Sequence, residues 1–496
     1  MIASLKNFVQ RLRPGRQLGY DAITDKGRRR APRTATHSED AILTRGGRHK
    51  MLATTRDIIR NITIAGWMVR CHLDYVSRFN FQAATGDDAL DDAIERLIER
   101  DSRRGNFDVR GRLSRAKAAR MMEARRILDG EIFVTKMAGG RVQLVEADRI
   151  RTPGEVPTGY DLTDYQDGLL ISPGGRLRSV IVCRRGDGGK GYIFERLIDA
   201  RNVWQHAYWD TTYRVDQLRG ISPLMPAINS LQDVYEGFDL AMAKAKVAQM
   251  FGLIFYRDAV DEAEGWQARR EQTNDADNDG LDDETGEAAA DQDRYVVDPG
   301  SGPFKLELDQ GDKAEFLSTN TPESELLEAL KFAVDLGLKG LDIPYSFWDA
   351  RAVNYYSRKA DIQQYEASAQ AKRDDNRQLW DEWTAWRLRL HILAGELELP
   401  GAMTLEDVRW DWVAAGMPWV DKLRDMKADE LALQIGQDSR VRMARRNGNN
   451  AYDLAREEME FERWEIDERQ RRDLPPKGVP VAVGTTDNEG KADDNA

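Results

Sequence analysis

The segment 217–258 constrains the fold most, because it predicts one long helix that leads directly into a strand. An Arg-Gly turn followed by Pro223 opens the helix, and an apolar strand at 252–257 follows it. A helix of about 26 residues spans roughly 39 Å at 1.5 Å per residue. No side chain in the segment indicates catalytic chemistry. The pattern therefore predicts a structural element that carries the chain from one region to another.

Apolar residues form a narrow stripe along this helix, at alternating spacings of three and four residues: Ile228, Leu231, Tyr235, Phe238, Met242 and Ala245. Such a stripe suits packing against one partner helix. Lysine, glutamine and alanine make the C-terminal half of the helix half-polar, which favours a helix packed in a ring with one face in water. The alternative is an ordinary core helix, which would have a wider apolar face.

The composition limits the classes of protein. A length of 496 residues suggests two to four domains, and a hydrophobic content of 41% can form a sizeable core. The net charge of −12 disfavours binding nucleic acid through the whole surface. Cys71 and Cys183 are far apart and are expected to be free thiols. No apolar run reaches the ~18 residues of a membrane span and no signal peptide is recognisable, so we expect a soluble, non-secreted protein.

The first 50 residues are basic, with twelve Lys or Arg and four acidic residues. Few of them are apolar, so 1–51 is expected to be a poorly ordered N-terminal arm. The arm could contact nucleic acid or an acidic neighbour, and a solvated tail is the alternative. Its candidate contact residues are Arg28, Arg29, Arg30 and Arg33.

The next part of the chain predicts a mixed α/β region. Helical periodicity appears at 54–76, 89–103 and 112–130, where Gly130 ends the last helix, and hairpins follow at 131–150 and 178–198. The turn of the second hairpin, "GDGGKG", is rich in glycine. It lacks the spacing of a phosphate-binding loop and lies between two strands, so a flexible hairpin turn is the better interpretation.

An acidic loop at 273–293 follows the strand that ends the long helix. Asp275, Asp277 and Asp279 match the beginning of a calcium-binding loop, but the twelfth position, which should be glutamate, is Gly286. We therefore interpret the segment as a solvated acidic loop, with calcium binding as the alternative.

The remainder of the chain is mainly helical. It predicts a helix at 321–341, an aromatic-rich loop at 344–357, and the longest helix of the chain at about 356–393. A strand at 407–415 and two charged helices split at Asn447-Gly448 follow. Short strands at 294–298 and 303–308 precede the helix at 321–341. The tail from Pro475 has a composition typical of disorder.

The sequence offers no catalytic site. Its histidines are scattered and unpaired at metal-ligand spacing: His37, His49, His72, His206 and His391. It contains no nucleophile elbow, P-loop or defensible Cys–His set. His206 lies among aromatic residues, which suits a packed histidine better than a general base. The sequence therefore argues against an enzyme, and we expect no cofactor.

The order of these elements, with several of their sequences, resembles the lambda-type family of tailed-phage portal proteins. The resemblance rests on "DGEIFV", "LVEADRI" and "QLRGISPLMPAINSLQDVYEGFDLAMAKA", and on "NYYSRKADIQQYEASAQAKRDDNRQLWDEWTAWRL" and the segment 416–462. It covers about 52–474. The acidic loop, the absence of a self-cleavage signature and the corner "KGLDIPYSFW" depart from the family pattern.

The resemblance implies an α+β subunit of portal type that assembles as a ring. Its parts would be a wing at 52–222, a stem of helices at 223–250 and 319–343, a β-rich clip at 251–318, a tunnel loop at 344–357, the long helix with a return to the wing at 358–418, a helical crown at 419–474 and a tail at 475–496.

The resemblance also implies a function. Portal proteins form rings, typically of twelve subunits, at one capsid vertex of the virion, and assemble in the host cytoplasm. The ring conducts double-stranded DNA during packaging and ejection, and docks the terminase large subunit and later a head–tail adaptor. Major capsid and scaffold proteins are further partners, and no membrane is involved. Another phage head structural protein, or a DNA-binding protein acting through the basic arm, is the alternative.

Two sets of site residues follow from the resemblance. Tunnel residues near the DNA would be Trp348, Arg351, Asn354, Lys339, Lys331, Lys244 and Lys246. Residues of the clip that dock the motor or adaptor would be Asp275, Asp277, Asp279, Asp282, Asp283 and Glu284. For Phe347 and Trp348 the alternative is burial against the long helix.

Overall fold

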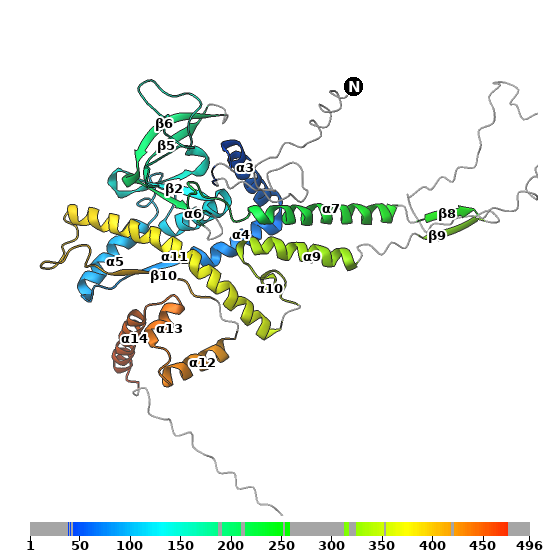
Figure 1. The fold of residues 1–496 in the computed structure, drawn as a ribbon. Helices are drawn as coiled ribbons and strands as arrows, with labels where there is room; N and C mark the ends of the chain where they lie inside the picture. The colour runs from blue at the N-terminus through cyan, green and yellow to red at the C-terminus, as the bar shows by residue number, and fades with distance from the viewer. Residues whose placement is uncertain are drawn as a thin grey trace, which may run out of the picture. The chain divides into compact units, whose positions relative to one another are not determined.

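The computed structural model describes residues 38, 40, 43–186, 191–209, 214–250, 253–257, 312–316, 324–351, 354–417 and 421–474. The chain forms two compact units, Met1–Gln232 with Ala333–Ala496, and Asp233–Phe332. Helices and small antiparallel sheets make it an α+β protein, as the sequence predicts (Figure 1). Several predictions lie outside the described residues: the arginines at 28–33, the acidic loop 273–293, the strands at 294–298 and 303–308, and the tail.

Four helices begin the first unit: α3 (Arg45–Asn61), α4 (Thr63–Val76), α5 (Asp88–Ser102) and α6 (Arg115–Asp129). The single helix predicted at 54–76 is wrong, because the chain is extended at Ile62, where φ is −108° and ψ is 108°. The run of β-branched residues from Ile62 to Ile64 weakens helix propensity at the break. The arm predicted at 1–51 is also too long, because α3 begins at Arg45. The Arg48 side chain is buried and is hydrogen-bonded to the rest of the fold.

Two sheets lie next to these helices. In the first, β2 (Glu131–Lys136) pairs antiparallel with both β3 (Val142–Glu146) and β7 (Val203–Ala207). In the second, β5 (Leu177–Arg185) pairs antiparallel with both β4 (Leu169–Ile171) and β6 (Tyr192–Asp199). Both predicted hairpins are confirmed. The "GDGGKG" segment joins β5 to β6, where Gly186 N donates a hydrogen bond of 3.2 Å to Gly191 O.

The core of the first unit lies between α5, α6, the first sheet and the long helix α11 (Tyr355–Leu393). Trp380 and Trp383 of α11 pack against Trp412 of β10, with ring centroids 6.0 and 6.3 Å away. β10 (Trp410–Ala414) pairs antiparallel with β1 (Phe79–Ala83). The long helix therefore links parts of the chain that are far apart in sequence, such as Arg387 and Asp101, which are 286 residues apart. Its prediction at 356–393 is confirmed.

The predicted helix–strand–helix order around the second unit is confirmed where it is described. α7 (Ile228–Met250) leads to β8 (Leu253–Arg257), which pairs antiparallel with β9 (Asp312–Phe316). The chain returns through α9 (Ser324–Leu338), a 3-10 turn at Lys339–Leu341, and the short helix α10 (Tyr345–Trp348). Part of the predicted loop 344–357 is thus helical.

Three helices end the described chain: α12 (Lys422–Gln434), α13 (Arg440–Arg446) and α14 (Ala451–Arg471). The split predicted at Asn447-Gly448 is confirmed. The first of the two predicted helices is itself broken after Gln434, where Gly436 has φ +74° and takes a conformation that glycine adopts readily. Among the described residues, no helix is both long and apolar enough to cross a membrane.

Candidate functional site

The turn that precedes α7 is anchored by a buried arginine. The Arg219 guanidinium donates hydrogen bonds to the carboxylate of Glu131 and, at 3.0 Å, to the carbonyls of Ala147 and Ile150. Arg48 Nη1 donates to the carbonyl of Gly220 at 2.9 Å. Buried guanidinium groups with several acceptors are strongly held. The base of α7 is therefore fixed to the first sheet.

Two glycines allow this anchor to form. A Cβ atom on Gly220 would lie 2.0 Å from Gly130 O, and a Cβ on Gly130 would lie 2.5 Å from Gly220 O. Gly130 also has φ +83° at the end of α6. The glycines of "QLRGISP" and "DGEIFV", which carry part of the family resemblance, thus contact each other across the fold.

The corner after α9 is held by the long helix. Asp342 has φ +60°, a left-handed conformation that a non-glycine residue rarely adopts. Its carboxylate accepts hydrogen bonds from Lys372 Nζ at 2.8 Å and Ser368 Oγ at 2.6 Å, both on α11. Lys372 Nζ also donates to Leu341 O at 3.2 Å. These bonds position the start of the predicted tunnel loop.

Three of the predicted tunnel residues lie in this short segment. The Trp348 side chain is 45% exposed and packs edge-on against Trp67, with ring centroids 5.2 Å apart. Arg351 is exposed and its Nε is 2.9 Å from Asp349 Oδ1. Asn354 Oδ1 accepts from Ser357 N at 2.9 Å and so caps α11. Phe347, by contrast, packs against Tyr365 of α11, the burial that the sequence offers as its alternative.

The predicted lysines lie on the helices before this segment. Lys246 on α7 and Lys331 on α9 are exposed. Lys339 Nζ is 4.0 Å from Asp335 Oδ1, a surface ion pair. Lys244 belongs to α7, and its side chain is outside the described part of the structure. Lys246 and Lys331 thus lie on α7 and α9, and Lys339 lies on the 3-10 turn that follows α9.

The apolar stripe of α7 is covered only at its beginning. Ile228 and Leu231 are buried, and a Cβ on Gly337 of α9 would lie 2.7 Å from Leu231 Cδ2. Farther along α7 the side chains of Tyr235, Phe238 and Met242 are 49%, 59% and 43% exposed. α9 exposes Leu327, Phe332 and Leu336. The stripe predicted to pack on one helix is therefore buried at its start and about half exposed farther along in the single chain.

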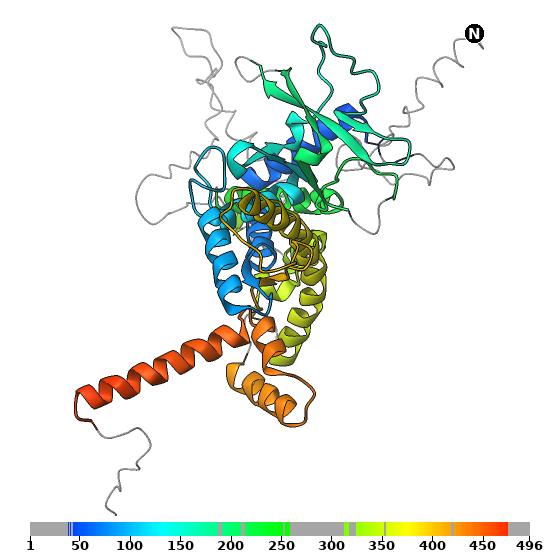
Figure 2. The same ribbon diagram turned by 90° about the vertical axis from the view of Figure 1, so that its left-hand side faces the viewer.

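The C-terminal helix α14 has no buried residue. It nevertheless carries large exposed apolar side chains: Leu454, Met459, Phe461, Trp464 and Ile466. Figure 2 shows most of α14 clear of the other elements. Exposed apolar side chains concentrated on one helix are typical of an element that contacts another protein.

A buried polar network joins α4, α6, β7 and α11. Glu123 contacts His72 Nε2 at 2.9 Å, Arg126 Nε at 2.8 Å and Asn376 Nδ2 at 3.0 Å. Burial raises the pKa of Glu123, but Arg126 and His72 outweigh it and hold that pKa well below its usual value. No sequence signal indicates the network, because Glu123 and Asn376 are 253 residues apart.

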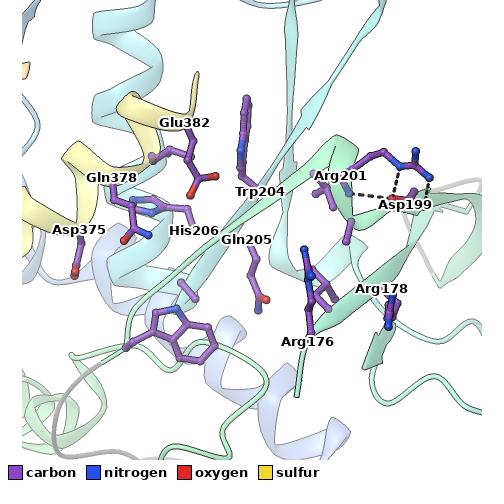
Figure 3. Close-up of a pocket in the computed structure, with 16 residues that line it drawn as sticks. Arg176, Arg178, Asp199, Arg201, Trp204, Gln205, His206, Asp375, Gln378 and Glu382 are labelled. Atoms are coloured by element: carbon purple, nitrogen blue, oxygen red, sulfur yellow. Dashed lines mark hydrogen bonds and ion pairs between the residues drawn. The ribbon is translucent and has the colours of Figure 1, made fainter. Parts of the chain in front are cut away.

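His206 belongs to this network. Its Nε2 is 2.9 Å from Asn376 Oδ1, and burial, together with the Arg126 charge, lowers its pKa to about 4. The prediction of a packed histidine is confirmed. Figure 3 shows His206 beside a hollow of about 770 Å³ between β7 and α11. Arg178 and Arg201 line it together with Asp199, Asp375 and Glu382, so charges of both signs face the space, and no nucleophile is poised there.

Metal binding has no support in the described part of the chain, where no group of three His, Cys, Asp or Glu side chains could hold an ion. The calcium candidates Asp275, Asp277 and Asp279 lie outside the described residues. Cys71 and Cys183 are free thiols, as predicted.

The match to a protein family covers most of the chain. The family described as phage portal protein, lambda family, matches residues 26–386. The chain belongs to this family. A structural role in a portal or connector follows from membership in the lambda portal family. The match ends within α11, so α12–α14 lie beyond it. No curated protein matches the sequence.

Solved structures with a similar chain come from gene transfer agent (GTA) particles. They include the neck of an empty particle computed with C6 symmetry, at TM-score 0.43 and 12% identity, covering 77% of this chain and 89% of that one. A chain of the virion of the native particle gives TM-score 0.41 and 12% identity, with 78% and 89% covered. The native neck computed with C12 symmetry gives 0.40 and 13%, with the same coverage.

Proposed function

We propose that twelve copies of this chain form a ring at one capsid vertex, and that double-stranded DNA enters and leaves the capsid through it. Membership in the lambda portal family supports the proposal. On this proposal the protein is part of the virion and the ring assembles in the host cytoplasm. The wing, stem, clip, tunnel loop and crown would have the boundaries that the sequence predicts.

The observation that carries the ring is the uncovered apolar surface of α14. A helix of 21 residues without a buried side chain gains little from tertiary packing, which is what normally stabilises helices in proteins. Phe461 and Trp464 lie 57% and 56% exposed. Burying each of these side chains contributes about 1.5–3 kcal/mol to stability. We therefore expect a neighbouring subunit to cover them. The exposed part of the apolar stripe of α7 would be buried by a neighbouring subunit in the same way.

Trp348, Arg351 and Asn354 would lie near the narrowest part of the channel. An acidic ring lets phosphates slide past, because repulsion prevents the counterion release that would hold DNA. The exposed cations Lys246, Lys331 and Lys339, together with Lys244, would soften that barrier. Changing these lysines to glutamine one by one, and measuring DNA retention in filled capsids, tests which of them face the channel.

The clip would dock the terminase large subunit during packaging and the head–tail adaptor afterwards. Its carboxylates, Asp275, Asp277, Asp279, Asp282, Asp283 and Glu284, would steer a basic partner and raise its association rate. Deleting 273–293 should weaken docking at low salt, and unchanged packaging and adaptor binding would make the loop a solvated insert. Major capsid and scaffold proteins would contact the outside of the ring, and Arg28, Arg29, Arg30 and Arg33 an acidic neighbour or DNA.

Native mass spectrometry with negative-stain images of the purified protein tests the ring. Twelve copies of a 56.4 kDa chain give a mass of about 680 kDa, and the images should show a central hole. A stable monomer or dimer that binds duplex DNA would overturn the ring and point to the basic arm.

A further inference from the structure

An arginine-rich groove lies in the first unit, and none of the predicted tunnel or clip residues lines it. It is a hollow of about 680 Å³ formed by the α5–α6 loop, α6, β2, β3 and β5, of which α6, β2 and β5 are labelled in Figure 1. Six arginines and two carboxylates line it. That balance is the reverse of the whole chain, whose net charge is −12. We call this hollow the arginine groove.

Half of these arginines already have partners. Arg149 Nη2 is 2.7 Å from Glu195, Arg185 Nη2 is 3.1 Å from Asp148, and Arg125 Nη1 is 3.8 Å from Asp129. The exposed side chains of Arg110, Arg112 and Arg184 form no ion pair with any of the described residues. Three guanidinium groups from two segments of the chain thus face the groove with their charge uncompensated there.

The groove also has apolar surface. Met121 of α6 is 44% exposed, and Leu113, Ile132 and Leu144 complete the apolar lining. A phosphate backbone alone would gain nothing from these side chains. A ligand with both carboxylates and apolar side chains would use the arginines and the apolar lining together.

Asp108 gives a second indication of the ligand. Its side chain lines the groove and is almost fully buried, yet its Oδ2 has no hydrogen-bond partner among the described residues. A buried carboxylate oxygen without a donor is costly. A peptide N–H could donate a hydrogen bond to this carboxylate, whereas a DNA backbone has no N–H or O–H group to donate. The groove therefore favours a peptide over a nucleic acid.

We propose that the arginine groove is a docking site for an extended acidic peptide with apolar side chains, contributed by another protein. Its carboxylates would pair with Arg110, Arg112 and Arg184, and one apolar side chain would cover Met121. The guanidinium fork suits paired bonds to carboxylates. The site goes beyond the channel function and does not depend on the ring.

Fluorescence anisotropy on the purified full chain tests this site, with a short dye-labelled peptide in which glutamate and leucine alternate. A peptide of equal length and charge, with glutamate and serine alternating, is the comparison, and a short DNA duplex is the competitor. We expect the leucine peptide to bind about tenfold more tightly than the serine peptide. Equal affinities, or no binding, would overturn the proposal, and tighter binding of the duplex would assign the groove to nucleic acid.

Matched variants locate the binding. Reversing Arg110, Arg112 and Arg184 to glutamate should weaken the leucine peptide by about tenfold or more. Reversing Arg60, Arg178 and Arg389, which are exposed elsewhere, changes the net charge equally and should leave binding within about twofold. Equal losses in both would show a general charge effect and refute the site. Met121→Ser should weaken only the leucine peptide, and circular dichroism checks that each variant folds.

Discussion

The region around α6 and α11 and the C-terminal helices α12–α14 place their side chains in opposite ways. Around α6 and α11, charged residues such as Glu123 and Arg126 are buried with partners on other elements. On α14, apolar residues such as Phe461 and Trp464 are exposed without cover from the chain. The first region is complete within one chain. The second has the surface of a protein that is stable in an assembly, and the two should respond differently to mutation.

The largest expected effect is on the buried network. Glu123→Ala removes the buried counterion of Arg126, which keeps only its ion pair with the half-exposed Asp375, and should lower the free energy of unfolding by about 3–5 kcal/mol. Glu457→Ala, on the exposed surface of α14, should change it by under about 0.5 kcal/mol. Urea unfolding followed by tryptophan fluorescence measures both. Equal effects of the two substitutions would contradict the contrast between the regions.

His206 should make the same region sensitive to acid. Because its folded pKa of about 4 is below the unfolded value of about 6.5, the unfolded state binds the proton first as the pH falls. Neutral His206 therefore contributes fully to the unfolding free energy above pH about 6.5. This contribution, about 3 kcal/mol in all, is lost as the pH falls from about 6.5 to 4.

His206→Gln, which does not titrate, isolates this contribution. The variant should lose stability less steeply than the parent chain between pH about 6.5 and 4, measured as unfolding free energy at several pH values. Some slope should remain, because burial also lowers the pKa of His72. Identical slopes would show that folding does not lower the pKa of His206.

Disturbing the contact between Gly130 and Gly220, at the turn before α7, should give a smaller loss of stability. Gly220→Ala forces a methyl group into Gly130 O and should cost about 2–3 kcal/mol of unfolding free energy. Gly46→Ala in α3, where a Cβ meets nothing within 4 Å, should leave stability unchanged or raise it by under about 1 kcal/mol. Thermal unfolding compares them, and a neutral Gly220→Ala would mean that the two backbone segments can separate at little cost.

Substitutions in α14 should have the smallest effect on the stability of the single chain. Phe461→Ser with Trp464→Ser should change the unfolding free energy of the dissociated chain by under about 0.5 kcal/mol but reduce ring assembly. Leu393→Ser, at a still more exposed apolar position outside α14, should leave assembly intact. Sedimentation velocity measures the assembled fraction, and normal rings from the double variant would place the subunit contact elsewhere.

Local sequence patterns predict most of the helices and strands correctly. They fail where a contact between residues far apart in the sequence determines the structure. The helix at 356–393 is free of Pro and Gly and is found as α11, and Gly130 ends α6 as expected. The break at Ile62 and the helical start at Arg45 are missed. Arg48 is in a basic, polar stretch that resembles a disordered arm, and only its contact with Gly220 shows why it is buried.

The candidate site divides in the same way. Trp348, Arg351 and Asn354 are predicted for the tunnel from their place in the family pattern, and the structure shows that all three are exposed. The network around Glu123 and the arginine groove have no local pattern, since their members come from segments far apart in the chain.

The sequence by itself determines the order of helices and strands, the acidic charge and the family, because propensity, periodicity and turn residues act over a few neighbouring positions. The tertiary structure alone decides which charges are buried in pairs, why Gly220 must be small, and which apolar side chains remain exposed. Those properties depend on distances between residues that are hundreds of positions apart, and burial changes the energy of a charge or a methyl group far more than its sequence neighbours do.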